Sequence, residues 1–224
     1  YFIEKKISSN YRWSKYIYYT WQIEKKKLLK NGSTWIDIGP FYGGLQGIVA
    51  KDYKNLKIIL VDFHHQLCRS YLYLSKIFPE SKHIMPAEIN DINKLEIIGS
   101  NYFIYVPIQN ITQLNKLKPT LVTNFFSFGE MTKHTFESYL NSQFIKKAEF
   151  VYTVNRFISS PCFEMTYNND LSILDYKIKN FKNIYFDAFP INHYQTPYRK
   201  IHNRYAPRPT SSSYFELIMK RTTK

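Results

Sequence analysis

The segment between residues 34 and 62 constrains the fold more than any other part of the sequence. Residues 34–38 form a short apolar run that ends at Gly39, and residues 43–52 are suited to a helix. Residues 56–61 form a continuous run rich in β-formers, which is typical of a strand buried on both faces. A strand, a glycine turn, a helix and a second strand in this order predict the beginning of an α/β fold.

The same alternation continues to the end of the chain. Further helices are expected at residues 64–78, 91–98 and 133–144, and further strands at 82–85, 102–106, 120–126, 150–154, 183–186 and 214–219. The pattern predicts a Rossmann-like α/β fold with a mostly parallel sheet and helices on both faces.

Two segments stand apart from this alternation. Residues 1–30 contain no Gly or Pro and carry an aromatic stripe, so we expect a helical segment packed on a domain of residues 31–224. Residues 187–212 hold four prolines among many aromatic and basic side chains, which favours a long functional loop. A chain of 224 residues otherwise favours a single domain.

The formal net charge of +14 comes from 24 Lys and 7 Arg against 17 acidic residues. Sites that clamp nucleic acid favour Arg for its bidentate geometry, so this charge favours a lysine-rich, solvated surface that attracts acidic substrates, with nucleic acid a less favoured partner. Cys68 and Cys162 fit no metal or redox spacing, and no cluster with metal-ligand spacing is present. We therefore expect a metal-independent, cytoplasmic protein without a membrane span.

The glycine turn predicts a nucleoside cofactor site. Ligands of open α/β sheets bind at the carboxyl ends of the strands, where the first strand delivers Asp37 and the second ends in Asp62. Gly39 and Gly43 would let the backbone approach a ligand closely, and the following helix would direct free N–H groups at it. Asp62 would accept both hydroxyls of a ribose.

Phe41 decides between cofactors. A dinucleotide site requires a glycine at this position to admit the pyrophosphate, and a bulky ring would obstruct it. S-adenosylmethionine has no pyrophosphate, and Asp37 suits its cationic amino and sulfonium groups. The residues therefore favour S-adenosylmethionine over a nicotinamide cofactor.

Two stretches carry a resemblance to known families. The run from Asp37 to Gly44 resembles motif I of class I S-adenosylmethionine-dependent methyltransferases, except that Phe41 stands where glycine is usual. Residues 121–131 are similar to the N-x-x-S-x-x-E-M signature of the sugar O-methyltransferases of bacterial surface-polysaccharide gene clusters. The resemblance implies a seven-stranded sheet and methylation of a sugar hydroxyl on a nucleotide- or lipid-linked precursor.

The same resemblance assigns cofactor residues one by one. It puts Asp37, Gly39 and Gly43 around the methionine part of S-adenosylmethionine, and Phe41 is a further expected cofactor-binding residue. Asp62 then falls on the ribose, with Phe63 on the adenine, and Asn124 and Ser127 border both cofactor and acceptor. The residue that caps adenine follows the third core strand. It lies among Pro107 to Gln109 if that strand is 102–106, which the spacing favours, or near Ala87 and Glu88 if the strand is 82–85.

The acceptor side needs a base, because a sugar hydroxyl is a poor nucleophile until it is deprotonated. Glu130 is the first candidate and His134 the second. The alternative for Glu130 is a capping box with Ser127 ahead of a helix over residues 131–140, and for His134 a solvated surface position. Arg156 follows the fifth strand and would clamp a phosphate or acidic sugar, unless it is only a surface side chain.

The long loop offers further acceptor contacts. Aromatic rings stack on sugar faces and arginines bind diphosphates, so the loop would close over the acceptor through Tyr194, Arg199, His202 and Arg204.

Three other function classes remain open. Base-methylating enzymes usually carry Pro-Pro after the Asn or Asp that ends the fourth strand, and residues 124–127 contain no proline. Enzymes that methylate ribose or tRNA are not excluded by this argument. An oxidoreductase is disfavoured by Phe41, whereas a non-catalytic Rossmann-like binding module would keep the same fold. The sequence does not determine the oligomeric state.

Overall fold

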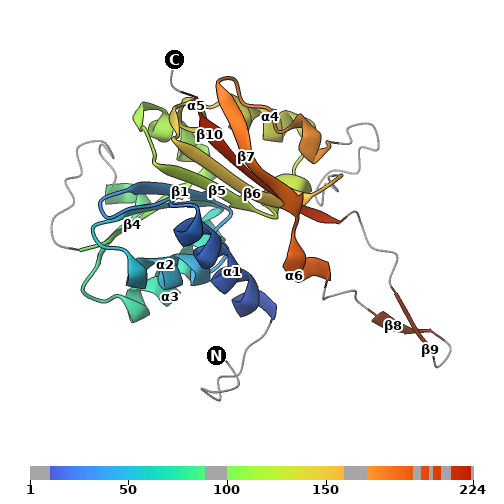
Figure 1. Cartoon of the computed structure of the whole chain (residues 1–224). Helices are drawn as coiled ribbons and strands as arrows, with labels where there is room; N and C mark the ends of the chain where they lie inside the picture. The colour runs from blue at the N-terminus through green and yellow to red at the C-terminus, as the bar shows by residue number, and fades with distance from the viewer. Residues whose placement is uncertain are drawn as a thin grey trace.

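The computed structural model describes residues 11–88, 100–158, 171–193, 198–201, 204–207 and 213–222. The expected helix at residues 91–98 lies outside this part. Within it, one eight-stranded sheet forms the centre of the molecule (Figure 1). Its strands are β1 (Thr34–Ile38), β2 (Lys57–Asp62), β3 (Lys82–Ile84), β4 (Tyr102–Pro107), β5 (Leu121–Phe125), β6 (Phe150–Arg156), β7 (Phe181–Ala188) and β10 (Tyr214–Arg221).

The strand order is β3-β4-β2-β1-β5-β6-β10-β7. The strands from β3 to β6 are parallel, and β10 is antiparallel to both β6 and β7. Because β1 lies between β2 and β5, the strand order progresses one way from β1 towards β3 and the other way from β5 onwards. Open α/β sheets bind ligands at such a switch in strand order. We call the side on which the parallel strands end the carboxyl edge.

The sheet has one strand more than the seven that the resemblance implied. Both candidates for the third core strand are present, but they hold different positions. β4 pairs with β2 over its whole length, whereas β3 pairs only with β4 and is an outermost strand of the sheet. The third core strand is therefore β4, as the spacing favoured, and Pro107 is its last residue.

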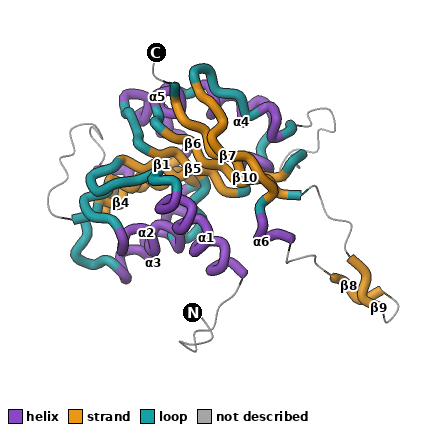
Figure 2. The backbone as a smooth tube through the Cα atoms, in the orientation of Figure 1, coloured by secondary structure: helices purple, strands orange, loops and turns teal. Residues whose placement is uncertain are grey.

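Helices cover both faces of the sheet (Figures 1 and 2). On one face α1 (Tyr11–Lys25), α2 (Gly44–Asp52) and α3 (His64–Ile77) bury Tyr19, Val49 and Leu74 against the sheet. The other face is covered by α4 (Lys133–Asn141), α5 (Gln143–Lys147) and the 3-10 helix η3 (Ile108–Lys116). Each face has its own hydrophobic core, so the sheet is shielded on both sides.

Helix boundaries differ from expectation at two places. The N-terminal helix ends at Lys25 rather than near residue 30, because Lys27 adopts a left-handed φ of 55°. Leu28 and Leu29 are nevertheless buried beneath it. The helix expected over 133–144 is split into α4 and α5 at Ser142, whose backbone is extended.

The segment 187–212 is not a loop throughout. Pro190–His193 form a short helix, α6, and β8 (Tyr198–Ile201) pairs with β9 (Arg204–Pro207) as an antiparallel hairpin. Among the described residues, none of the helices is both long and apolar enough to cross a membrane.

Candidate functional site

The turn after β1 has an unusual backbone. Gly39, Phe41 and Gly43 have φ values of 77°, 59° and 89°, all in the left-handed region. Phe41 is the residue that departs from the glycine-rich pattern, and it accepts this conformation although it carries a side chain. Ser70 of α3 donates a hydrogen bond of 2.8 Å to its carbonyl oxygen. The turn is thus tied to α3 as well as to β1.

Protein contacts account for both glycines. A β-carbon on Gly39 would lie 2.6 Å from Ser127 Oγ, and one on Gly43 would lie 2.8 Å from Leu74 Cδ1. The missing side chains therefore let the turn pack against the loop after β5 and against α3. Close approach of the cofactor to the same backbone stays a prediction.

Asp37 lies beneath this turn and is only 2% exposed. Its carboxylate accepts hydrogen bonds from Thr123 Oγ1 (2.5 Å) and from the Gln46 amide, so it joins β1 to β5 and α2. Burial is the largest cause that raises the pKa of Asp37 to about 8, and the nearby charge of Asp62 adds to it. Its predicted contact with a cationic cofactor is not tested by this arrangement.

Asp62 ends β2 at the carboxyl edge and is partly exposed. Its carboxylate accepts hydrogen bonds from the backbone N–H of Phe63 (2.8 Å) and of Phe41. Burial raises the pKa of Asp62 above its usual range, while these two amides act against that rise. Pro107 lies beside Asp62 in the β2–β4 register. The structure therefore brings together the first turn and the residues predicted for ribose and adenine.

Phe63 is the N-cap of α3, and the residue is 45% exposed. The ring stacks on His65 at a centroid distance of 5.8 Å with an angle of 13° between the planes. An exposed ring at the end of β2 is accessible to a ligand, as the adenine prediction requires.

A pair of buried amides organises the loop after β5. Asn124 Nδ2 donates to the carbonyl oxygen of Ile38 (3.0 Å) and to Ser127 Oγ (2.5 Å), while Asn124 Oδ1 accepts from the Phe128 N–H (2.9 Å). Asn155 Nδ2 donates to Asn124 Oδ1 (3.1 Å). Asn124 is fully buried, so in this structure it braces the turn, and a direct contact with the cofactor remains a prediction.

The same amides set the position of Glu130. The 3-10 helix η4 (Ser127–Glu130) is held by two consecutive backbone amides. The Phe128 N–H donates to Asn124, and the Gly129 N–H donates to Asn155 Oδ1 at 2.9 Å. Asn155 was not among the predicted site residues, although its place directly before Arg156 at a strand end was a usable signal. Glu130 ends η4 with its side chain partly exposed.

The capping-box alternative for Glu130 does not describe this structure. α4 begins at Lys133, and its N-cap is Thr132, whose side chain accepts from the Thr135 N–H at 3.3 Å. Ser127 caps neither α4 nor η4. His134 lies on the exposed side of the first turn of α4. The catalytic roles of Glu130 and His134 remain predictions.

The first turns of α1 reach the carboxyl edge, which the sequence pattern did not indicate. The guanidinium of Arg12 lies 4.3 Å from the centroid of the Phe41 ring, and Lys15 Nζ lies 3.8 Å from that of Phe126. Tyr16 packs edge-on against Tyr42 of the turn, with 6.0 Å between ring centroids. An amphipathic stripe reports a packed face, but not which loops that face meets.

α1 is anchored further along by a buried carboxylate. Glu216 of β10 is fully buried and accepts hydrogen bonds from the hydroxyls of Tyr18 (2.7 Å) and Tyr152 (2.5 Å). Gln22 donates to the Tyr18 hydroxyl at 2.9 Å. Burial raises the pKa of Glu216, and the two tyrosine hydroxyls act against that rise.

Arg156 ends β6 at the same edge, and its Nε donates to the Tyr214 hydroxyl at 2.9 Å. The other predicted acceptor residues cannot be placed in the same way. Tyr194 and His202 lie outside the described residues. Arg199 belongs to β8 and Arg204 to β9, but only their backbones are described.

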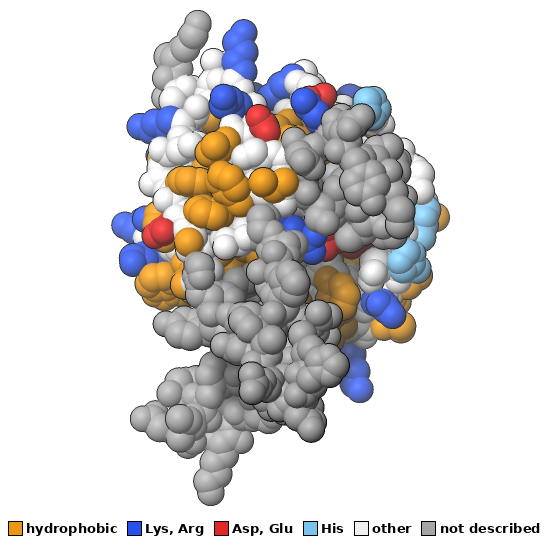
Figure 3. All heavy atoms as spheres, turned by 90° about the vertical axis from the view of Figure 1, so that its right-hand side faces the viewer, with side chains coloured by type: hydrophobic (Ala, Val, Ile, Leu, Met, Phe, Trp, Pro, Cys, Tyr) orange, Lys and Arg blue, Asp and Glu red, His pale blue; other side chains and the backbone are white. Residues whose placement is uncertain are grey.

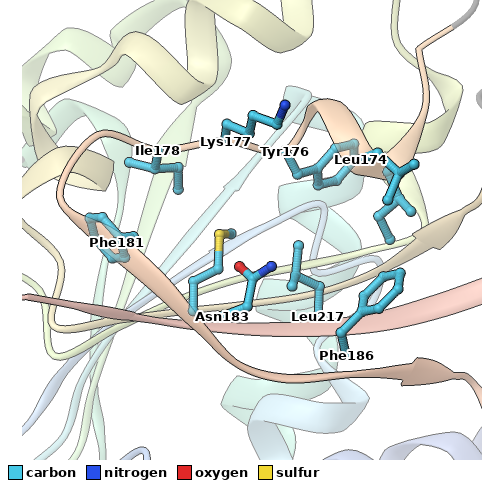
Figure 4. Close-up of a pocket in the computed structure, with 10 residues that line it drawn as sticks. Leu174, Tyr176, Lys177, Ile178, Phe181, Asn183, Phe186 and Leu217 are labelled. Carbon is cyan, nitrogen blue, oxygen red and sulfur yellow. The ribbon is translucent and has the colours of Figure 1, made fainter.

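A cavity of about 560 Å³ lies away from these residues (Figure 4). It opens to the surface and is lined by the segment around Tyr176 on one side and by Phe186 of β7 and Leu217 of β10 on the other, with mainly hydrophobic side chains. None of the predicted site residues contributes to it. The part of the chain that the structure describes contains no group of three or more His, Cys, Asp or Glu placed to hold a metal ion, and independence from metals stays a prediction.

Solved structures share this architecture. A candidate sarcosine dimethylglycine methyltransferase from Galdieria sulphuraria matches with a TM-score of 0.57 and 8% identity, over 93% of this chain and 86% of that one. A candidate methyltransferase from Bacillus halodurans C-125 matches with a TM-score of 0.53 and 10% identity, over 91% and 99%. The fold is that of the class I S-adenosylmethionine-dependent methyltransferases.

The small RNA methyltransferase HEN1 has the same fold, with a TM-score of 0.53 and 13% identity over 94% of this chain and 25% of that one. No family model and no curated protein matches the sequence. Because these similar proteins are named for different methyl acceptors, the class I fold does not identify the substrate.

Proposed function

We propose that this protein is an S-adenosylmethionine-dependent methyltransferase. The observation that carries the proposal is the placement of Asp62 in a class I fold. Its carboxylate lies at the carboxyl edge beside β1, is oriented by the amides of Phe41 and Phe63, and is partly exposed. A carboxylate in this position is suited to accept two ribose hydroxyls.

The surrounding residues fit the cofactor. Phe63 and Pro107 lie beside Asp62 and would enclose the adenine, while the turn of Gly39–Gly43 would face the methionine part. When bound, S-adenosylmethionine supplies a methyl group that is already activated by the sulfonium. The protein must then orient the acceptor and remove its proton.

Glu130 is suited to the proton-accepting role. It follows β5 in a rigid 3-10 turn, and the helix beyond it is capped by Thr132, so helix capping does not account for Glu130. Its carboxylate would take the proton of an acceptor hydroxyl or orient that hydroxyl. The resemblance of residues 121–131 to the sugar O-methyltransferase signature makes a sugar hydroxyl of a cytoplasmic precursor the proposed acceptor.

The binding step is tested by calorimetry with S-adenosylhomocysteine, NAD and NADP. Wild type should bind S-adenosylhomocysteine but neither NAD nor NADP. Asp62→Ala removes the acceptor of the ribose hydroxyls and should weaken that binding by about 1.5–3 kcal/mol. Asp52→Ala, at an exposed carboxylate that ends α2, is the matched control and should bind like wild type. Absence of S-adenosylhomocysteine binding to folded wild type would overturn the proposal.

RNA is the alternative acceptor, since a net charge of +14 attracts any polyanion even though the excess of Lys over Arg makes nucleic acid the less favoured partner. The positive charge would then lie against several phosphates, and RNA affinity would fall steeply with salt concentration. A salt titration of RNA binding separates the two acceptors, because a small acceptor contacts few phosphates.

A further inference from the structure

Three cations meet the carboxyl edge around the acceptor side of the proposed site. Arg12 and Lys15 come from α1, and Arg156 comes from the end of β6. We call these three residues the cationic rim. Although α1 and β6 are far apart in the sequence, the packing of α1 on the sheet brings all three side chains to one edge.

Aromatic contacts connect two members of the rim, Lys15 and Arg156, while Arg12 lies over the Phe41 ring. Lys15 Nζ lies over the ring of Phe126, at 3.8 Å from its centroid. The Phe126 ring packs on Tyr214 with 4.4 Å between centroids, and the Tyr214 hydroxyl accepts the hydrogen bond from Arg156. Lys15 and Arg156 therefore flank one pair of touching rings.

The rim concentrates positive charge at a partly buried place. Burial, and secondly the charge of Arg12, lower the pKa of Lys15 to about 8. An anion bound between the cations would raise the pKa of Lys15 again, since it favours the charged form of the amine. On the side of the molecule that faces the viewer in Figure 3, the Lys and Arg side chains that can be seen lie in several separate places.

We propose that the cationic rim binds a phosphate or diphosphate group of a small acceptor molecule, which makes the substrate of this protein a phosphorylated compound. The proposal rests on the proposed methyltransferase function. Arg156 and Arg12 offer planar donor groups that match phosphate oxygens, and Lys15 adds a compact charge. Two cations beside one pair of rings, with Arg12 on the neighbouring turn, match a single phosphate or diphosphate, whereas RNA requires a longer row of contacts.

The test measures binding of inorganic pyrophosphate by calorimetry. Wild type should bind it, and Lys15→Met and Arg156→Met should each weaken binding about tenfold, because each removes one charge-assisted contact. Lys15→Arg keeps the charge and should restore most of the affinity. Lys25→Met is the matched control: Lys25 lies over Trp21 at 4.3 Å on the same helix, at its opposite end, and the variant should bind like wild type.

S-adenosylhomocysteine binding is measured on the same variants and should not change. The two measurements separate the two proposals. If wild type does not bind S-adenosylhomocysteine, the methyltransferase proposal is wrong, while the pyrophosphate measurement still tests the rim. If Lys15→Met weakens S-adenosylhomocysteine as strongly as pyrophosphate, the rim holds the cofactor's carboxylate and our inference is wrong. It is also wrong if Lys25→Met loses as much pyrophosphate affinity as Lys15→Met, or if an RNA oligonucleotide binds at the rim and pyrophosphate does not displace it.

Discussion

Ser127 packs against Gly39 so closely that a β-carbon on Gly39 would lie 2.6 Å from Ser127 Oγ and 3.0 Å from Ser127 Cβ. This contact joins the turn after β1 to the loop after β5, the two segments that border the proposed site. Because Gly39 also has a φ of 77°, it is constrained by both backbone conformation and packing.

Gly39→Ala should therefore lower the free energy of unfolding by about 2–4 kcal/mol, through left-handed strain and overpacking together. Gly32→Ala is the matched control, since Gly32 has a φ of 79° but nothing within 4 Å of the position that a β-carbon would take. The control should cost about 1 kcal/mol from backbone strain alone, and urea unfolding of both variants measures the difference. Equal losses would show that the contact with Ser127 contributes nothing.

Asp37 should make stability depend on pH. Burial raises its pKa in the folded protein to about 8 from an ordinary value of 3.8, so the folded state binds the proton more tightly than the unfolded state. The contribution of Asp37 to stability is then full below about pH 4 and is lost as the pH rises towards 8.

Asp37→Asn should remove this slope. The asparagine can accept from Thr123, and a rotated Gln46 amide can accept from it through an oxygen that is buried without a partner in the present arrangement. The difference in melting temperature between variant and wild type should thus grow in favour of the variant between about pH 5 and pH 8. A difference in melting temperature that stays constant across that range would contradict the raised pKa of Asp37.

Glu130→Gln tests the proposed base. It preserves shape but removes basicity, so turnover of an acceptor should fall by about 10²–10⁴-fold with S-adenosylhomocysteine affinity nearly unchanged. Glu137→Gln, on the exposed surface of α4, is the control and should keep full turnover. Unchanged turnover in Glu130→Gln would leave Glu130 without a chemical role.

Tyr18→Phe removes one of the two hydroxyls that bond the buried Glu216. The loss of a hydrogen bond to a buried carboxylate should cost about 1.5–3 kcal/mol, and the amides of α1 should exchange faster with solvent deuterium. Tyr53→Phe, at a half-buried tyrosine outside α1, should leave α1 exchange unchanged. If both variants exchange alike, Glu216 does not anchor the helix.

Local patterns sufficed for the strands of the central sheet and for the first turn, but not for β8 and β9. The apolar run of 34–38, the glycine after it and the spacing to Asp62 are set by contacts between close neighbours, and the structure has β1, α2 and β2 there. The choice of β4 as third core strand was also correct, because β4 pairs with β2 along its whole length, whereas β3 has three residues and pairs only with β4.

Long-range contacts were beyond the sequence. Tyr18 and Glu216 are 198 positions apart, and no periodicity connects them. Two capping signals also overlap before α4, since Ser127 and Thr132 both suit an N-cap, and only the amides of Asn124 and Asn155 decide that the first becomes part of η4. Competing local signals of this kind are resolved by tertiary contacts.

The bond between Tyr18 and Glu216 has a consequence for synthesis on the ribosome. α1 is translated long before its buried partner, which belongs to β10, the strand that also separates β6 from β7 in the sheet. A nascent chain that has not yet released residue 216 lacks this bond, so α1 is then held only by its contacts with earlier segments such as the turn after β1. The attachment of α1 to β10 is therefore completed only at the end of synthesis.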